Sequence, residues 1–225
     1  MIKGKIAEVF DSVQGEGLYL GEKQIFVRLF GCNLNCRYCD TKMNSFLEYT
    51  PEELFNELKI YHQGDHTISF TGGEPLLQKD FLKEILKLTY KDNAKNYLET
   101  NGTLPQALEE VIEYVHIVAM DFKFPSSTGQ NSFWDEHRLF LETASQKEVF
   151  IKTVITETTE EKDLIEGLKL IREVAKYSIL ILQPDSGARD NLALNKKLED
   201  FKEICRRERI TACVIPQVHV IAGVK

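Results

Sequence analysis

Residues 24–39 read Gln-Ile-Phe-Val-Arg-Leu-Phe-Gly-Cys-Asn-Leu-Asn-Cys-Arg-Tyr-Cys, an apolar run followed directly by a loop with three cysteines. The run 24–30 predicts a buried strand, because short and nearly continuous apolar segments are typical of strands covered on both faces. The loop then places Cys32, Cys36 and Cys39 within eight positions. A turning loop of this length can bring all three sulfurs to one centre.

Outward from this loop, strand-like and helix-like segments alternate along the chain. One helix is expected to start at Pro51, because Thr50 is a good N-cap and Glu53 completes a capping box. The other clear helical patterns are 81–88, a short helix from Gln106, and a stretch with Leu164, Leu168, Ile171 and Val174 on one face. The further strand candidates are 67–70, 96–98, 116–120, 149–155, 179–183 and 212–215.

Repeated strand–helix units predict an α/β fold with a mostly parallel sheet, which right-handed crossovers curl in one direction. Because fewer than eight pairs are visible, we expect an incomplete, open TIM-like β/α barrel forming a single domain over residues 1–225. Two polar, glycine- or serine-rich stretches, 11–21 and 125–134, are expected to be loops. In such folds the functional residues lie at the C-terminal ends of the strands.

The charge balance excludes several classes of partner. The 225 residues include 28 Lys and Arg against 35 Asp and Glu, a formal net charge of −7, which repels nucleic acids and anionic membranes. The one basic run, Arg206, Arg207 and Arg209, lies among acidic residues and is expected to be a solvated helix face. Apolar runs are far shorter than the about 18 residues of a membrane span, and the N-terminus has no apolar signal region. We therefore expect a cytoplasmic protein with neither a nucleic-acid nor a membrane partner.

Three clustered thiols are a soft ligand set that suits an iron–sulfur cluster or zinc. A closed site takes four protein ligands, but the two other cysteines, Cys205 and Cys213, are distant and their spacing of eight matches no ligand pair. We expect both to be plain small hydrophobes. One metal position should thus be open to an external ligand. The alternative is a zinc site of three cysteines and one histidine in a non-enzymatic interaction module.

A second motif, residues 71–75 with the sequence Thr-Gly-Gly-Glu-Pro, follows the strand 67–70. Its glycines allow a ligand to approach the backbone, and Glu74 can receive a cation. Later strands also end in polar or turn residues, namely Glu99, Asn101, Gly102, Asp121, Lys123, Gln183 and Pro184. Taken singly, each of these could be a cap or turn residue.

The Cys-x3-Cys-x2-Cys loop, with Tyr38 before its last cysteine, and the Gly-Gly-Glu-Pro stretch together resemble the radical S-adenosylmethionine (SAM) superfamily. The resemblance implies a 4Fe-4S cluster on Cys32, Cys36 and Cys39, whose unique iron chelates SAM. An electron from that cluster then releases a 5′-deoxyadenosyl radical. By position the resemblance implies SAM contacts from Tyr38, Asp40, Gly73, Glu74, Glu99, Asp121, Lys123 and Gln183.

The N-terminal stretch 10–17, Phe-Asp-Ser-Val-Gln-Gly-Glu-Gly, places an amide and a carboxylate close together among glycines. Gln14 and Glu16 side chains can read the amino-pyrimidinone edge of a pterin or a guanine. Arg28, on the following strand, could hold a substrate carboxylate through two hydrogen bonds. The same residues could instead form a solvated turn and an ordinary ion pair.

Together with Phe-Val-Arg at 26–28, Gly-Cys-Asn at 31–33 and Cys-Asp-Thr at 39–41, this stretch resembles the 7-carboxy-7-deazaguanine synthase family. The match runs from Ile6 to the Pro-Gln-Val-His ending at 216–219. It implies a lyase that contracts 6-carboxy-5,6,7,8-tetrahydropterin to 7-carboxy-7-deazaguanine with loss of ammonia, in the biosynthesis of queuosine and other 7-deazapurines. The substrate contacts that it implies are Val13, Gln14, Gly15, Glu16, Arg28, Thr71 and His219.

The same resemblance implies three partners. A Mg²⁺ would be shared by the Thr41 hydroxyl and the substrate carboxylate, because hard ions prefer oxygen ligands. Reduced flavodoxin or ferredoxin would donate the electron, and the chain would form a homodimer. The alternative enzyme is a radical activating enzyme that installs a glycyl radical on a partner protein, although it has no evident use for the Gln-Gly-Glu stretch.

Overall fold

The computed structural model describes residues 2–61, 67–188 and 191–218. These residues form one nine-stranded sheet in the order β3-β1-β2-β4-β5-β6-β7-β8-β9. The strands are β1 (Gly4–Val13), β2 (Lys23–Leu29), β3 (Leu47–Tyr49), β4 (Thr67–Gly72), β5 (Lys95–Thr100), β6 (Ile117–Asp121), β7 (Glu148–Ile155), β8 (Leu180–Pro184) and β9 (Ala212–Val214). From β2 to β9 all neighbours are parallel, whereas β1 is antiparallel to β2 and β3. The sheet is not closed, which confirms the predicted open barrel.

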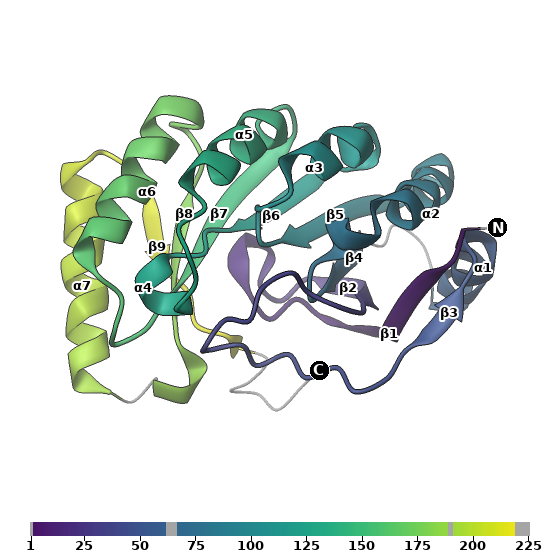
Figure 1. The fold of residues 1–225 in the computed structure, drawn as a ribbon, viewed down its shortest axis with the longest axis horizontal. Helices are drawn as coiled ribbons and strands as arrows, with labels where there is room; N and C mark the ends of the chain where they lie inside the picture. The colour runs from purple at the N-terminus through teal and green to yellow at the C-terminus, as the bar shows by residue number, and fades with distance from the viewer. Residues whose placement is uncertain (1, 62–66, 189–190, 219–225) are drawn as a thin grey trace.

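Helices line the outer face of the curved sheet (Figure 1). They are α1 (Pro51–Tyr61), α2 (Lys79–Lys91), α3 (Pro105–Val111), α5 (Trp134–Ala144), α6 (Glu161–Val174) and α7 (Leu192–Arg207), besides the single turn α4 (Pro125–Thr128). Helix α1 begins with the predicted capping box: Thr50 Oγ1 accepts from the Glu53 amide at 3.2 Å, and Glu53 Oε2 accepts from the Thr50 amide at 2.8 Å. In the described ranges no helix combines the length and apolar character needed to span a bilayer.

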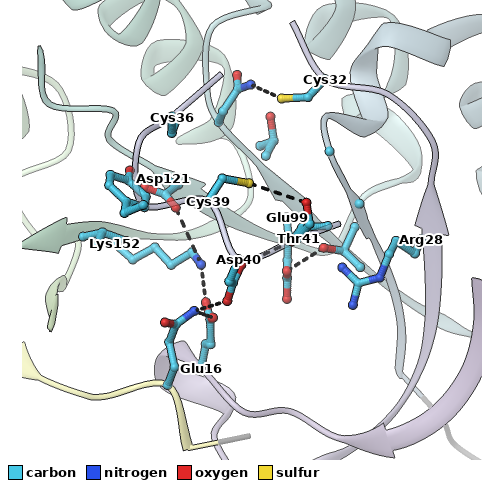
Figure 2. Close-up of a pocket in the computed structure, with 18 of the residues that line it drawn as sticks. Glu16, Arg28, Cys32, Cys36, Cys39, Asp40, Thr41, Glu99, Asp121 and Lys152 are labelled. Atoms are coloured by element: carbon cyan, nitrogen blue, oxygen red, sulfur yellow. Dashed lines mark hydrogen bonds and ion pairs between the residues drawn. The ribbon is translucent and has the colours of Figure 1, made fainter. Parts of the chain in front are cut away.

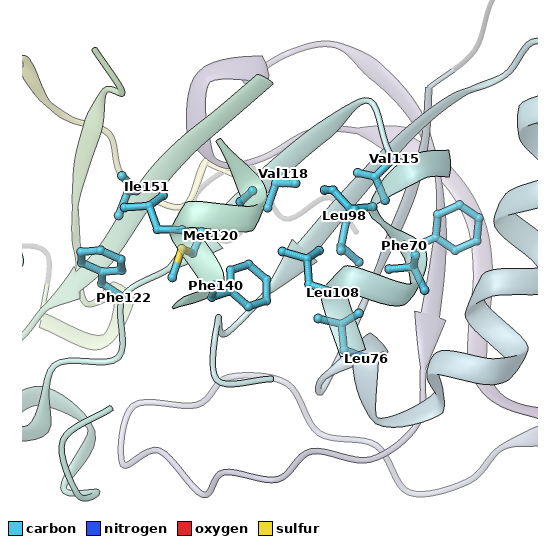
Figure 3. Close-up of a cluster of buried hydrophobic side chains, with 14 of the residues drawn as sticks. Phe70, Leu76, Leu98, Leu108, Val115, Val118, Met120, Phe122, Phe140 and Ile151 are labelled. Carbon is cyan, nitrogen blue, oxygen red and sulfur yellow. The ribbon is translucent and has the colours of Figure 1, made fainter. Parts of the chain in front are cut away.

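The main hydrophobic core fills the space between the sheet and these helices (Figure 3). Successive residues of a strand point to opposite faces, so every second residue of the buried strands faces the helices. Phe70, Leu98 and Met120 come from the sheet, and Leu108 and Phe140 come from the covering helices. All five side chains are fully buried.

A second, smaller core lies on the inner face of the sheet. Its buried members are Tyr97, Ile117, Ala119, Phe150 and Ile181. The turn of 3₁₀ helix at Gly17–Tyr19, between β1 and β2, packs onto it, with the Tyr19 ring centroid 5.6 Å from that of Tyr97. A Cβ atom at Gly17, whose φ is +71°, would lie 2.7 Å from Phe150 Cζ, so a glycine is required at this close approach. The β1–β2 connection therefore closes one end of the open barrel.

The two predicted loops are only partly loops. Residues 11–13 belong to β1, because they pair with β2 from Ile25 to Lys23, and this pairing is not visible in the local polar sequence. Residues 125–128 form α4, which starts at a proline and ends at Gly129 with φ +72°, and Trp134 already begins α5. Both predictions are corrected accordingly.

The basic run on helix α7 is solvent-exposed, as predicted. Arg206 and Arg207 are exposed and both pair with Glu203, so they form a solvated face. Cys205, on the opposite side of the helix, is fully buried in the main core, as expected of a small hydrophobe. Cys213 lies on β9 and is half-buried.

Candidate active site

A cavity of about 870 Å³ opens on the inner face, at the C-terminal ends of the parallel strands. Strand alternation places a polar residue near the end of each strand on this face. The residues that line the cavity in this way are Arg28 from β2, Thr71 from β4, Glu99 from β5, Asp121 from β6, Lys152 from β7 and Gln183 from β8. The cavity thus lies where the sequence predicts the functional residues, at the strand ends.

The three cysteines lie on the loop between β2 and β3, and all three line the cavity. Cys32 and Cys39 are exposed and Cys36 is half-buried; all three thiols are free. Burial raises the pKa of the Cys36 thiol to about 11, and the nearby Lys123 ammonium opposes this rise. In the described part of the chain no three His, Cys, Asp or Glu side chains are gathered to hold a metal ion, so the sulfurs lie along the cavity wall rather than around a preformed centre.

The donor set fits an iron–sulfur cluster better than zinc with a histidine ligand. The two histidines among the described residues, His116 and His137, do not line the cavity. His116 Nδ1 accepts from the Asn96 amide, and the buried His137 ring contacts the Asn101 carbonyl. The other three histidines, including His219 with its predicted substrate role, fall outside the described residues. Three soft thiols on one cavity wall match the ligands of a cluster with one open iron.

Neighbouring segments hold the cysteine loop from one side through a small amide cluster. Asn33 Nδ2 donates to Thr103 Oγ1 at 2.9 Å, and its Oδ1 accepts from Asn101 Nδ2 at 2.9 Å. The same Asn101 amide lies 4.0 Å from Cys32 Sγ. Asn101 and Thr103 follow β5, so the end of this strand positions the first cysteine.

The segment after β6 holds the other side of the loop. The Arg37 amide donates to the Thr128 carbonyl at 3.1 Å, and Gln130 Nε2 donates to the Asn35 carbonyl at 3.0 Å. The Arg37 side chain packs against Gly129, where a Cβ atom would lie 2.4 Å from Arg37 Nε. Residues 125–130, predicted only as a loop, therefore support the second cysteine.

The glycine pair of the second motif packs directly against the cysteine loop. A Cβ atom at Gly72, whose φ is +137°, would lie 2.1 Å from the Leu29 carbonyl oxygen, and one at Gly73 would lie 2.1 Å from that of Gly31. Both glycines line the cavity. Only glycine permits this approach, which exposes backbone to a bound ligand.

Glu74 is placed differently from the glycines. Its carboxylate is fully buried beneath the cavity wall, and it accepts from the Leu76 amide, Thr100 Oγ1 and the Asn101 amide at 3.0, 2.9 and 2.7 Å. Burial raises the pKa of Glu74 to about 7, and the hydrogen bonds from Asn101 and Leu76 oppose this rise. In this structure Glu74 fixes the end of β5, whereas the glycine backbone faces the cavity.

The carboxylate of Glu99, a predicted SAM contact, is hydrogen-bonded to two predicted substrate contacts. It accepts from Gln14 Nε2 at 2.8 Å and from Thr71 Oγ1 at 2.7 Å. Gln14 is buried and also donates to Gln24 Oε1 at 3.1 Å. The predicted substrate residues Gln14 and Thr71 thus lie beside the predicted SAM residue Glu99.

Paired charges cross the cavity from the N-terminal loop to the end of β6 (Figure 2). Lys152 contacts Glu16 and lies 3.6 Å from Asp121 Oδ2, and Lys123 Nζ lies 2.9 Å from the same oxygen. Although burial lowers the pKa of Lys152, Glu16 and Asp121 raise it above its usual value. Lys123 Nζ also donates to the Tyr38 hydroxyl at 3.4 Å, which links this network to the cysteine loop.

Two buried acceptors in the lining have no hydrogen-bond partner among the described residues. They are Asp121 Oδ1 and Gln183 Oε1. Gln183 is only 1% exposed, so its carbonyl oxygen is shielded from bulk water. Unpaired buried acceptors are costly, and a ligand with N–H or O–H donors would satisfy both.

Arg28 lies on the opposite side of the cavity from Lys152 (Figure 2). The cross-strand register sets Glu8 opposite Arg28 and Phe10 opposite Phe26. Arg28 Nε is 3.8 Å from Glu8 Oε1, and its guanidinium lies 5.8 Å from the Phe10 ring centroid. The Phe10 and Phe26 rings stack with centroids 5.1 Å apart, and both line the cavity. Val13 and Gly15 complete this wall.

The C-terminal segment reaches the same cavity. Gln217 Nε2 donates to Glu16 Oε1 at 2.7 Å and to Asp40 Oδ2 at 3.0 Å, and the Val218 amide donates to the Gly15 carbonyl at 2.9 Å. Asp40 Oδ1 in turn accepts from the Thr41 hydroxyl at 3.3 Å.

Sequence reasoning assigned no role to Lys152 or Gln217. The period-two alternation of β7 could have placed Lys152 on the inner face, one strand from Asp121. We find no local signal for Gln217, because its contacts join segments 177 and 201 positions away.

Comparisons with known proteins agree with this geometry. Residues 27–184 match the family model described as the radical SAM superfamily. The chain is 37% identical to a 7-carboxy-7-deazaguanine synthase of Geobacter sulfurreducens, covering 97% of each sequence, and 34% identical to one of Archaeoglobus fulgidus, covering both completely. Among solved structures it is similar to QueE from Escherichia coli, with a TM-score of 0.65 at 21% identity over 95% of this chain and 94% of that one.

Proposed function

This chain belongs to the 7-carboxy-7-deazaguanine synthase family of the radical SAM superfamily, and from that premise we propose that it converts 6-carboxy-5,6,7,8-tetrahydropterin to 7-carboxy-7-deazaguanine with loss of ammonia. It is a radical SAM lyase of queuosine biosynthesis, and the activating-enzyme alternative is not favoured by its relatives. We further propose that residues 1–225 act as a single domain.

One observation carries the proposal: a single cavity is lined at once by the cysteines, by Gly72 and Gly73, and by all the predicted substrate residues that the structure describes. A radical generated at a cofactor must meet its substrate within van der Waals reach, away from water. An enzyme that modified a partner protein would have no evident need for buried polar groups such as Gln14 in the same cavity as the cysteines.

The cysteine side of the cavity is proposed to hold the cofactors. Cys32, Cys36 and Cys39 would bind a 4Fe-4S cluster, which when bound supplies the electron that cleaves SAM. The Gly73 backbone would contact the methionine end of SAM, with Glu74 fixing the wall behind it. The unpaired acceptors of Asp121 and Gln183 would take N–H or O–H donors of the same cofactor, with further contacts from Tyr38, Asp40, Glu99 and Lys123.

The β1–β2 side is proposed to hold the substrate. Gln14, Thr71 and Glu99 form one hydrogen-bonded group whose remaining acceptor sites would face a pyrimidinone edge, and Arg28 offers its guanidinium to the carboxylate. The stacked pair of Phe10 and Phe26 offers an apolar surface to a flat bicyclic ring. Val13 and Gly15 would line the ring, and the substrate role of His219 stays a prediction from the family likeness.

Glu16 is given a supporting role in this proposal. Both of its carboxylate oxygens hold protein groups, Lys152 on one and Gln217 on the other. We therefore propose that it anchors residues 13–17, which we call the substrate loop.

The remaining partners are proposed on the family likeness. Thr41 would contribute its hydroxyl to a Mg²⁺ shared with the substrate carboxylate, and the adjacent Asp40 supplies a second hard oxygen. We propose reduced flavodoxin or ferredoxin as the electron donor, a homodimer as the assembly, and the cytoplasm as the location.

The test is a product assay on anaerobically reconstituted protein with the pterin, SAM, Mg²⁺ and reduced flavodoxin. We expect about four irons per chain and a deazapurine product. Cleavage of SAM without a deazapurine product would reject the synthase and favour the activating enzyme. A colourless protein with one zinc would reject radical chemistry altogether.

A further inference from the structure

Gln217 connects two loops that contribute to different halves of the site. Its side-chain amide donates one hydrogen bond to Glu16, in the substrate loop at residues 13–17, and one to Asp40, in the cysteine loop. Figure 2 shows the side chains of Glu16 and Asp40 close to each other. A backbone hydrogen bond from Val218 to Gly15 fixes the same segment in place.

The contact requires a side chain that can donate to two carboxylates at once. An amide NH₂ group has two N–H donors, and here each carboxylate takes one of them. Without that group, two like charges from separate segments would face each other near the cavity mouth. The contact brings these charges together while Lys152 holds the other oxygen of Glu16.

We propose that Gln217 is a positioning residue for the reaction: it fixes the substrate loop against the cysteine loop and so sets the distance between substrate and cofactor. This inference rests on the proposed function. Gln217 need not touch either ligand, because it acts through Glu16 and Asp40. Misplacement of the substrate loop would leave SAM cleavage intact but would reduce the fraction of cleavage events that lead to product.

The experiment compares Gln217→Glu, Gln217→Ala and Gln217→Lys in the full reconstituted protein. The measured quantity is the ratio of deazapurine formed to SAM cleaved, with iron content and melting temperature measured beside it. For Gln217→Glu we expect this ratio to fall about tenfold or more, because a third carboxylate repels the other two. The ratio should fall less in Gln217→Ala. In Gln217→Lys, which restores a donor to both carboxylates, the ratio should stay close to that of the wild type.

Gln146→Glu is the matched control, because the same charge change falls on an exposed position after α5. It should leave the ratio unchanged. Hydrogen exchange provides a readout that needs no turnover: Gln217→Glu should speed exchange in both 13–17 and 32–41, and Gln146→Glu should change neither segment.

An unchanged ratio in Gln217→Glu would overturn the inference, as would a fall accompanied by loss of iron or of melting temperature, which indicates a merely structural role. If the wild-type protein forms no deazapurine, the proposed function fails instead. In that case hydrogen exchange alone tests whether Gln217 links the two loops. Unchanged exchange in Gln217→Glu would show that it does not.

Discussion

The two ends of the sheet's inner face have opposite characters. Toward the N-terminal ends of the strands the face is apolar, with Tyr97, Phe150 and Ile181 packed under the β1–β2 connection. Toward the C-terminal ends the same strands carry Glu99, Lys152 and Gln183 around the cavity. The two sets form pairs that are two positions apart on one strand: Tyr97 and Glu99, Phe150 and Lys152, and Ile181 and Gln183. Both members of a pair therefore point to the same face of the sheet.

This difference separates stability from chemistry within one curved sheet. The apolar end removes aromatic surface from water and contributes folding free energy. The polar end keeps buried charges and unpaired acceptors, which cost stability unless a partner satisfies them. Substitutions at one end should therefore unfold the protein, and substitutions at the other should inactivate a folded protein.

The largest effect is expected from the cysteine loop. Cys36→Ser should abolish cluster binding and SAM cleavage, because one of three ligands is lost, while the melting temperature of the metal-free protein stays nearly unchanged. Iron analysis, a cleavage assay and thermal unfolding measure these three results. Cys213→Ser is the control, since Cys213 is half-buried on β9 and does not line the cavity. Full iron content in Cys36→Ser would contradict the assignment.

The apolar end is tested by Phe150→Ala. This ring is buried, and it contacts Tyr19 and Tyr97 at centroid distances of 6.3 Å. We expect a loss of about 3–5 kcal/mol in the free energy of unfolding, measured with denaturant. Phe46→Ala, at a partly exposed ring, should cost much less. Equal losses in the two variants would remove the distinction between the ends.

The pH dependence of stability tests His137, whose buried ring contacts the Asn101 carbonyl behind the polar end. Burial lowers the pKa of His137 to about 4, whereas a histidine in the unfolded chain titrates near 6.5. The folded protein therefore binds this proton less readily, so the stabilising contribution is complete above pH 6.5 and is lost as the pH falls toward 4. The loss is at most about 3 kcal/mol. His137→Gln keeps a donor for the Asn101 carbonyl but cannot titrate.

Unfolding free energies of the wild type and His137→Gln, measured from pH 7 to pH 4, should differ in slope over this window. Many carboxylates titrate in the same range, so only the difference between the two proteins isolates the histidine. Parallel curves would show that the ring titrates normally.

The smallest effect is expected from Arg28→Ala on the substrate side. Loss of a charge-assisted contact should cost about 1.5–3 kcal/mol of substrate binding, which is roughly a 10- to 100-fold fall in kcat/KM for the pterin. SAM cleavage without substrate and the melting temperature should not change. Arg206→Ala, on the solvated face of α7, is the matched control. An equal fall in unstimulated SAM cleavage would place Arg28 in the cofactor site instead.

Local signals predicted most of the fold. The capping box at Thr50 and Glu53 fixed the start of α1 because both hydrogen bonds form within four residues. Residues 11–13 of β1 and the helix at 125–128 were predicted only as loops, because these elements depend on pairing and packing with distant segments. For the site, residues at the strand ends were predictable from alternation and from the family likeness. The buried carboxylate of Glu74 and the contacts of Gln217 depend on tertiary placement.

Among the described residues the open sheet ends at two edge strands, β3 and β9, and this affects how such an enzyme can change during evolution. A closed barrel cannot gain a strand without altering the tilt and stagger of all the others. In this open sheet, strands or whole domains can be added at either edge during evolution while the seven parallel strands keep their spacing. Descendants of very different length can therefore inherit the same reaction centre.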